Sequence, residues 1–305
     1  MISAFPKIFA LGTTYIGNIF DDEVEITEKV DGSQFAFGVK DGILYTRSKG
    51  TQIHGIASIT DKDLFYPAMK HVTDLYMDNV IPEGYTMYCE TLKSVKHNTL
   101  KYNRVPKNNL ILFGISCKDG SFINDYEMLK QMSETLDIET VPLLYRGKVD
   151  DIEKLHELLN TESVFGGPNI EGFVVKNYNQ KFLLGGQPMP LMSGKYVSEA
   201  FKEVHINSWK KENTGKGKWD LYKEGFRTEA RWNKAIQHLK EKGELEDSPR
   251  DIGALIKEVH RDITEEEKDN IKEYLWKNFG SEVLRISTRG LPEYYKQTLM
   301  ENSIK

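Results

Sequence analysis

The character of the sequence changes near Lys210, and this change limits the folds that the chain can adopt. Before it, short apolar runs separated by turn residues predict strands; after it, apolar residues recur at helical spacing. The segment 210–218 is polar and contains glycine, which is typical of a linker. We therefore predict a β-rich domain over 1–208, a linker over 209–219 and a helical domain over 220–305, an α+β organisation.

Local patterns predict the individual elements. Asp41-Gly42 is a two-residue hairpin signal, and a second hairpin is expected around 177–180. Ser248-Pro249 predicts a helix start, and 264–267 resembles a capping box before another helix, which we expect to end at Gly280. The expected strands are 24–27, 35–39, 43–46, 85–89, 110–117, 172–176 and 181–184, and the other expected helices are 61–79, 126–136, 151–159 and 228–242.

Composition excludes several classes of protein. The 305 residues are 39% hydrophobic, enough for a sizeable core, so a fully disordered chain is excluded. No apolar run of about 18 residues predicts a transmembrane helix, and the first residues lack a signal-peptide pattern, so we expect a cytoplasmic protein. Two cysteines, Cys89 and Cys117, are too few for a disulfide scaffold or a cysteine-rich zinc site.

Charge is distributed unevenly along the chain. The formal net charge is −5, yet the stretch 195–240 holds eleven basic and six acidic residues. A basic stretch on an acidic protein can attract phosphates. The alternative is a solvated surface whose charges pair with one another.

The sharpest local feature is Glu28-Lys29-Val30-Asp31-Gly32, in which a lysine lies between a strand and a tight turn. Taken alone, the pattern also suits a surface hairpin with a solvated lysine. Five further features follow in order, each of them weak alone. They are Arg47 at the end of the hairpin strand, Glu90 and Phe113 within apolar strands, Glu171-Gly172-Phe173-Val174-Val175-Lys176, and Met192-Ser193-Gly194-Lys195.

Together these motifs resemble the covalent nucleotidyltransferase superfamily of polynucleotide ligases and RNA capping enzymes. The closer resemblance is to RNA ligases like RNA ligase 2 of T-even bacteriophages, and it covers residues of about 25–203. It implies a β-rich nucleotidyltransferase domain, an ATP-grasp-like ligase fold, followed here by a small all-α domain. DNA ligases and capping enzymes instead continue into an OB-fold with a basic motif near R-x-D-K, which this sequence lacks.

The resemblance also implies roles for individual residues. Lys29 is the expected nucleophile, and Lys195 is expected to contact the α-phosphate. Glu171 is expected to hold a metal ion through a bound water or to contact Lys29. The expected nucleotide-binding residues are Glu28, Asp31, Gly32, Arg47, Glu90 for the ribose, Phe113 for the adenine, and Lys176; Gln34 and Arg47 are expected to contact RNA ends. A lysine nucleophile must be neutral, so we expect burial, Lys176, Lys195 and a magnesium ion to lower its pKa.

The implied activity is ATP-dependent RNA ligation through a lysyl-N-AMP and an RNA-adenylate. Its expected substrates are breaks with 5′-phosphate and 3′-hydroxyl ends in a nicked duplex or a structured RNA such as tRNA. The expected cofactor is Mg²⁺, with Mn²⁺ as the alternative, and the chain is expected to be a monomer.

Departures from the family pattern keep alternatives open. Relatives often carry two lysines in the last motif, whereas Ser193-Gly194-Lys195 leaves one, which corresponds to either of the two. Gly114 stands where many relatives have an acidic residue. The alternatives are a DNA ligase or capping-type guanylyltransferase, and an RNA-binding protein with a degenerate nucleotidyl site.

Overall fold

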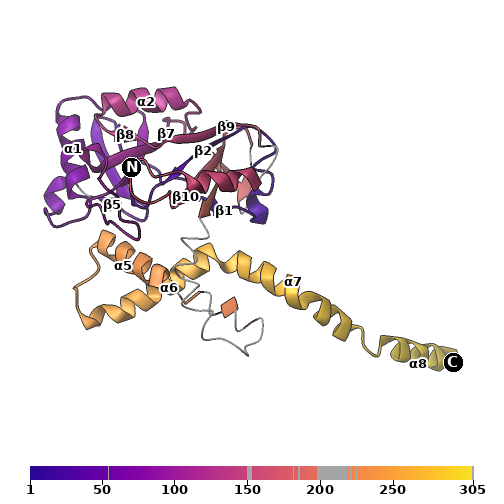
Figure 1. Ribbon diagram of the computed structural model, residues 1–305. Coiled ribbons are helices and arrows are strands. Elements are labelled where there is room, and N and C mark those ends of the chain that lie inside the picture. The colour runs from indigo at the N-terminus through magenta and orange to yellow at the C-terminus, as the bar shows by residue number, and fades with distance from the viewer. Residues whose placement is uncertain are drawn as a thin grey trace. The chain divides into compact units, whose positions relative to one another are not determined.

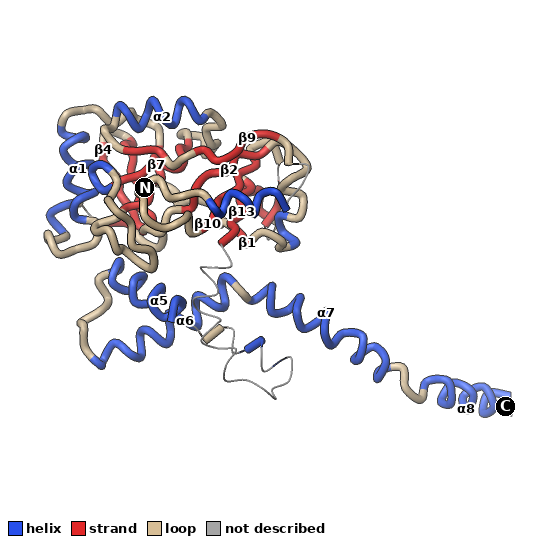
Figure 2. Tube along the Cα trace, in the orientation of Figure 1, coloured by secondary structure: helices blue, strands red, loops and turns tan. Residues whose placement is uncertain are grey.

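The computed structural model describes residues 1–53, 55–149, 153–180, 182–184, 186–197, 219, 222–223, 226–227 and 229–303 (Figure 1). It divides into two compact units, Met1–Glu258 and Val259–Lys305. The predicted linker 209–219 lies outside the described residues apart from Trp219. Within the described residues, all strands precede residue 198 and helices predominate after it, as the strand and helix colours of Figure 2 show.

A six-stranded sheet forms one layer of the β-rich part. Its order is β5 (Gln52–Ile53), β4 (Ile43–Ser48), β3 (Ser33–Lys40), β6 (Thr86–Thr91), β7 (Leu110–Ser116) and β8 (Glu139–Thr140). Asp41 and Gly42 join β3 to β4 with φ of 54° and 70°. Positive φ at both central residues is what a tight hairpin turn of this length requires, so the first predicted hairpin is confirmed.

Helices α1 (Tyr66–Met77) and α2 (Tyr126–Thr135) cover one face of this sheet. Phe35, Phe37, Met87 and Leu112 of the sheet are fully buried in the core that they share with the helices. Burying a large apolar side chain stabilises a fold by about 1.5–3 kcal/mol, so this face anchors the strands.

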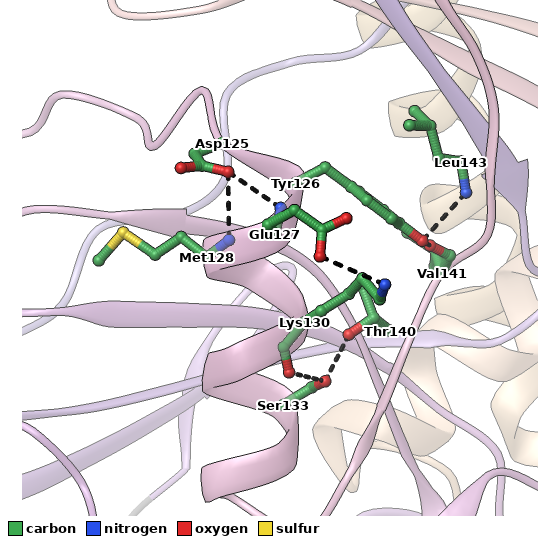
Figure 3. Close-up of polar contacts among 9 residues, drawn as sticks. All are labelled: Asp125, Tyr126, Glu127, Met128, Lys130, Ser133, Thr140, Val141 and Leu143. Carbon is green, nitrogen blue, oxygen red and sulfur yellow. Dashed lines mark hydrogen bonds and ion pairs between the residues drawn. The ribbon is translucent and has the colours of Figure 1, made fainter.

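Polar contacts fix α2 to the chain that follows it (Figure 3). Asp125 caps the helix by accepting hydrogen bonds from the backbone N–H groups of Glu127 and Met128 at 2.9 and 3.2 Å. The Tyr126 hydroxyl donates to the carbonyl of Val141 and accepts from the N–H of Leu143. The segment leading into β9 (Leu143–Gly147) is therefore held against the helix.

A five-stranded sheet forms the second layer, in the order β1, β13, β10, β2 and β9. Its strands are β1 (Phe9–Ala10), β2 (Val24–Lys29), β9, β10 (Gly172–Asn177) and β13 (Met192–Val197). β10 pairs antiparallel with both β2 and β13. The predicted hairpin from 172–176 to 181–184 is therefore wrong, because β11 (Phe182–Leu184) pairs with β12 (Gln187–Met189) instead.

The reason lies in the burial of β10, because Phe173 and Val175 pack on one face and Lys176 is buried on the other. A strand buried on both faces needs a neighbour on each edge. The side chain of Asn177 turns the chain away from β10 by accepting hydrogen bonds from the N–H groups of Asn179 and Gln180.

The two sheets enclose a second core, and the functional residues lie at its edge. Ala36, Tyr88 and Ile111 of the six-stranded sheet pack there with Val30 and with the N-terminal Phe5. The opposite face of the five-stranded sheet packs on 3-10 turns at Thr14–Ile16 and Glu153–Asn160. The helix predicted over 151–159 is thus a 3-10 helix in its described part. Shorter 3-10 turns lie at Ile56–Ser58, Lys107–Asn109 and Pro249–Asp251.

The described residues after 228 form four helices joined by short connections: α5 (Glu229–Lys242), α6 (Ile252–Glu266), α7 (Lys268–Ser287) and α8 (Leu291–Ser303). Ser248 caps the turn that leads into α6, with Asp251 completing the capping box. The predicted box at 264–267 is wrong, because α6 continues to Glu266 and Thr264 bonds back to the carbonyl of His260.

The predicted stop at Gly280 is also wrong, since α7 runs through it to Ser287. Gly280 has no positive φ, and its missing side chain leaves room for the ring of Trp276, whose atoms lie 3.0 Å from an added Cβ. A glycine stops a helix when it adopts the left-handed conformation, and here it does not.

The α+β fold class is confirmed, with a β-rich region followed by helices. Within the part of the chain that the structure describes, none of the helices combines the length and apolar character needed to cross a bilayer.

Candidate active site

Lys29 is the last residue of β2, and the turn Val30–Gly32 links it to β3. The turn is fixed from the side: Asp31 Oδ2 accepts from the N–H groups of Thr99 and Leu100 at 2.7 Å each. A Cβ on Gly32 would lie 3.0 Å from the carbonyl oxygen of Thr91. Asp31 and Gly32 therefore shape the turn that carries Lys29, and neither lines the pocket described below.

Strand register brings Lys29 to Glu171. β2 pairs Lys29 with Gly172, the first residue of β10, so the preceding Glu171 stands beside the lysine. The Nζ–Oε2 distance is 2.5 Å. Glu171 is buried, whereas 25% of the Lys29 side chain stays exposed. Buried Glu171 therefore holds the amine on one side, while Lys29 remains accessible from the pocket that it lines.

The electrostatic surroundings of Lys29 contradict one expectation. Burial lowers its pKa, but the carboxylates of Glu171, Asp31 and Glu90 together raise the pKa above its ordinary value. The expectation of a pKa lowered by Lys176 and Lys195 is therefore wrong for this state. The sequence places basic residues near the motif, but only the fold shows that three carboxylates surround the amine.

Glu90 is the last residue but one of β6, where burial raises its pKa to about 8. The charge of Lys29 opposes this shift, and the charges of Glu241 and Glu171 add to it. Its Oε2 atom is buried and has no hydrogen-bond partner among the described residues. A buried acceptor without a donor is costly unless a ligand supplies one.

A pocket open to solvent, about 500 Å³ including that open space, joins Lys29 and Glu90, and Glu171 stands beside Lys29 outside its lining. Six residues expected at the site line it: Glu28, Lys29, Glu90, Phe113, Lys176 and Lys195. Phe5, Ile8, Thr27, Val30, Val141 and Val174 complete the wall. The sequence offered no signal for Phe5 and Ile8, because they reach the pocket from the N-terminal segment.

Phe113 enters the pocket through an irregularity in the sheet. Tyr88 pairs with Gly114 and Cys89 with Leu112, so Phe113 is the extra residue of a β-bulge. The ring of Phe5 packs edge-on against Phe113, with centroids 5.0 Å apart. A Cβ at Gly114 would lie 3.2 Å from the same Phe5 ring, which explains the small residue there.

Lys176 lies on the floor of the pocket and is almost fully buried. Its Nζ donates to the carbonyl of Phe113 at 2.6 Å and pairs with Glu25 at 3.5 Å. Burial lowers the pKa of Lys176, and Glu25 opposes that shift. These bonds place Lys176 behind Phe113 as a support of the bulge.

Lys195 lines the pocket from β13, opposite Val174 of β10. Burial raises the pKa of Glu171, and the positive charges of Lys29 and Lys195 oppose that shift, so Lys195 acts electrostatically on the Lys29–Glu171 pair. Ser193 stands two residues earlier on the same face of β13, opposite Lys176.

Three expected residues have other partners. The Glu28 carboxylate accepts hydrogen bonds from the Ser163 hydroxyl at 2.6 Å and the Val164 N–H at 3.1 Å. Arg47 donates to the carbonyls of Ile2, Ser48 and Lys49, and Gln34 is paired with Glu90 across β3 and β6. Arg47 and Gln34 lie outside the pocket wall.

The loop after Glu90 joins the site through His97. The N–H of Lys93 donates to His97 Nδ1 at 3.1 Å, which leaves Nε2 as the donor to the Ser33 hydroxyl at 2.9 Å. Burial lowers the pKa of His97 to about 4, against the charge of Asp31. His97 is therefore neutral at pH 7 and orients Ser33.

Helix α5 contributes residues that the sequence did not indicate. Gln237 hydrogen-bonds to Ser33, although 204 positions separate them. Glu241 is close enough to raise the pKa of Glu90. No cluster of three or more metal-binding side chains occurs within the residues described.

Comparison with known proteins identifies the fold. A structure of Naegleria gruberi RNA ligase with PPi matches with a TM-score of 0.50 and 19% identity, covering 68% of this chain and 58% of that ligase. A variant of it with AMP and Mn matches with TM-score 0.50 and 19% identity, covering 68% and 59% of the two chains. Another with ATP and Mn gives 0.50 and 18%, covering 67% and 58%.

This chain therefore matches less than two thirds of the length of those ligases, and at this identity the likeness shows a shared fold. No curated protein sequence matches significantly. The RNA ligase family model matches residues 22–197, a span that contains Lys29, Glu90, Phe113, Glu171 and Lys195. Because that match covers more than half of the sequence, the protein belongs to the RNA ligase family.

Proposed function

We propose that this protein is an ATP-dependent RNA ligase that seals 5′-phosphate and 3′-hydroxyl ends. The observation that carries the proposal is the pocket in which the Lys29 amine, the unpartnered Glu90 Oε2 and the Phe113 ring converge. These groups suit the phosphate, the ribose and the base of one nucleotide. The solved Naegleria gruberi ligase of the same fold has variants with ATP or AMP and Mn, which supports a nucleotide here.

In the proposed first step, the Lys29 amine attacks the α-phosphorus of ATP, forming a lysyl-N-AMP and releasing pyrophosphate. The amine must first lose a proton, which its three carboxylate neighbours oppose. The Glu171 carboxylate at 2.5 Å is positioned to accept that proton. Lys195 lies where it would neutralise charge on the α-phosphate.

The site suits a magnesium ion only with help from the nucleotide. Carboxylate oxygens are the ligands that Mg²⁺ prefers, and Glu171 supplies one, directly or through water. Since the described residues contain no cluster of three such side chains, the ATP phosphates and water would complete the coordination. Such an ion would supply positive charge beside Lys29.

The later steps are transfer of AMP to a 5′-phosphate and attack by a 3′-hydroxyl, which releases AMP. Gln34 and Arg47 lie outside the pocket wall and remain our candidates for contacts to RNA ends. The same proposal includes membership in the group of RNA ligases like RNA ligase 2 of T-even bacteriophages. It also includes a nicked or tRNA-type substrate and a monomeric state. The domain limits 1–208 and 220–305 belong to it as well.

The test is incubation with magnesium and α-labelled ATP, followed by a denaturing gel. Acid-labile label on the wild type and on the exposed-residue control Lys40→Ala, but not on Lys29→Met, is the expected result. Circular dichroism establishes that Lys29→Met is folded. A folded wild type that takes no label from ATP or GTP, and carries no AMP by mass, overturns the proposal and leaves RNA binding without catalysis.

Parallel reactions separate the related enzymes. Labelling by GTP instead of ATP indicates a capping-type guanylyltransferase. Sealing of DNA 3′-hydroxyl ends, with none of RNA ends, indicates a DNA ligase.

A further inference from the structure

The Ser33 hydroxyl is the meeting point of three segments beside the pocket. It belongs to the first residue of β3, directly after the turn that carries Lys29. It accepts a hydrogen bond from His97 of the loop after β6 and another from Gln237 of α5. Its own hydrogen is directed to Glu241, whose pKa is lowered by that bond against the raising effect of burial.

Two hydrogen-bond donors and one positive charge act on the Glu241 carboxylate. The Ser33 hydroxyl and the Gln237 amide hydrogen-bond to it, the latter at 2.8 Å, and the charge of Lys49 attracts it. A hydroxyl, an amide and an ammonium group form a donor set that suits any oxyanion, including a phosphodiester. Glu241 is partly buried among them.

Helix α5 approaches the residues that follow β4. His238 Nε2 lies 2.9 Å from the position of a Cβ on Gly50, so a larger residue there would displace the His238 ring. Glu258 of α6 bonds to His238 and lies 3.8 Å from Lys242, which steadies the face of α5 that carries Glu241.

The location distinguishes this donor set from the nucleotide pocket. Ser33, Lys49 and Gln237 do not line the pocket, whereas Glu241 is near enough to Glu90 to raise its pKa. A phosphate bound here would lie next to the ribose side of the nucleotide. The ATP phosphates would lie elsewhere in the site, beside Lys29 and Lys195.

We propose that Ser33 and Lys49 form a binding site for a backbone phosphate of RNA, and that Glu241 of α5 fills this site until RNA displaces it. The proposal rests on the proposed RNA ligase function and names a substrate contact of the same site. It makes α5 an internal competitor, since the carboxylate and the phosphate need the same donors.

The test measures binding of a fluorescent nicked RNA duplex with a 5′-phosphate to the full chain, without ATP, over a series of salt concentrations. The main variant is Glu241→Gln, which removes the charge and keeps the side-chain size. The matched control is Glu244→Gln, which removes the same charge from an exposed residue just beyond the same helix. Thermal melting verifies that each variant is folded.

We expect Glu241→Gln to bind RNA about fivefold more tightly than Glu244→Gln at low salt and to steepen the salt dependence by about one counterion. Adding Lys49→Ala to Glu241→Gln removes this gain, and adding Ser33→Ala reduces it. Equal binding by the two single variants overturns the proposal, as does weaker binding by Glu241→Gln.

The assay separates this proposal from the proposed function. RNA binding is measured without nucleotide, so loss of ATP labelling in the wild type contradicts the ligase function whatever the binding result. Normal labelling together with equal RNA binding by Glu241→Gln and Glu244→Gln contradicts only the phosphate site.

Discussion

Glu171 Oε2 lies 2.5 Å from Lys29 Nζ, and the pairing of Lys29 with Gly172 fixes this contact. The nucleophile proposed for the reaction is therefore held as an ammonium ion in the nucleotide-free protein. Glu171 both positions the amine and raises its pKa, and these two effects act on the rate in opposite directions.

Glu171→Gln should separate the two effects. Removing the carboxylate leaves Asp31 and Glu90 as the groups that raise the pKa of Lys29, so the pKa falls. The alkaline rise in the rate of lysyl-AMP formation should move to lower pH by about one unit, while the maximal rate falls by about tenfold or more. Single-turnover labelling between pH 7 and 12 measures both, because the rate levels off only above the raised pKa of Lys29. An unmoved profile, matching the exposed control Glu134→Gln, would contradict the prediction.

Glu90→Gln should change how stability depends on pH. Glu90 titrates near 4.5 when unfolded and at about 8 when folded, so between these values the folded protein retains a proton that the unfolded chain has lost. Wild-type stability should fall as pH rises through this window, by at most about 1.4 kcal/mol per pH unit from this group. Melting temperatures from pH 5 to 9 should show a shallower decline for Glu90→Gln. Parallel curves for the two proteins would show that Glu90 is ionised throughout.

Lys176→Met should destabilise the fold by about 3–5 kcal/mol, because it leaves the Glu25 carboxylate buried without its cation. Adding Glu25→Gln should recover much of the loss, since no buried charge then remains. Denaturant titration of the two variants gives the comparison. If the double variant is no more stable than Lys176→Met, the bond from Lys176 to the Phe113 carbonyl is the larger contribution.

Phe5→Ala should weaken ATP binding because Phe5 lines the pocket and packs on Phe113. We expect about 3 kcal/mol of lost stability and a several-fold higher KM for ATP. Phe122→Ala is the matched control, as its ring also packs on Phe5 but does not line the pocket. It should lose stability and keep its KM. Equal KM values in the two variants would remove Phe5 from the nucleotide site.

Local signals in the sequence predicted local structure well. Asp41-Gly42 formed its hairpin because both residues accept positive φ, a property of two adjacent positions. The partners of β10 depended on burial of both its faces, which a five-residue apolar run does not express. The helix boundaries near 264 and 280 failed because neighbouring turns outweighed one capping pattern and one glycine.

The same distinction applies to the site: residues within motifs were predicted, and residues from distant segments were not. The residues within motifs, such as Lys29, Glu90 and Lys195, meet in one pocket as the resemblance implied. Phe5 and Glu241 reach the site from segments that lie far away along the chain, and neither has a pattern of its own. The pKa of Lys29 was misjudged because it depends on the distances to three carboxylates, and only the packed sheets determine these.

The bulge at Phe113 has a consequence for how base preference can change among such enzymes. Because residue 113 is the unpaired position between Leu112 and Gly114, its side chain is not constrained by a partner across the ladder. Lys176 holds the bulge through a backbone carbonyl, a group that every amino acid supplies. If Phe113 contacts the base as we propose, a single substitution there would alter the surface offered to the base while the pairing of β6 with β7 is kept, and this position would be a point of divergence in nucleotide choice.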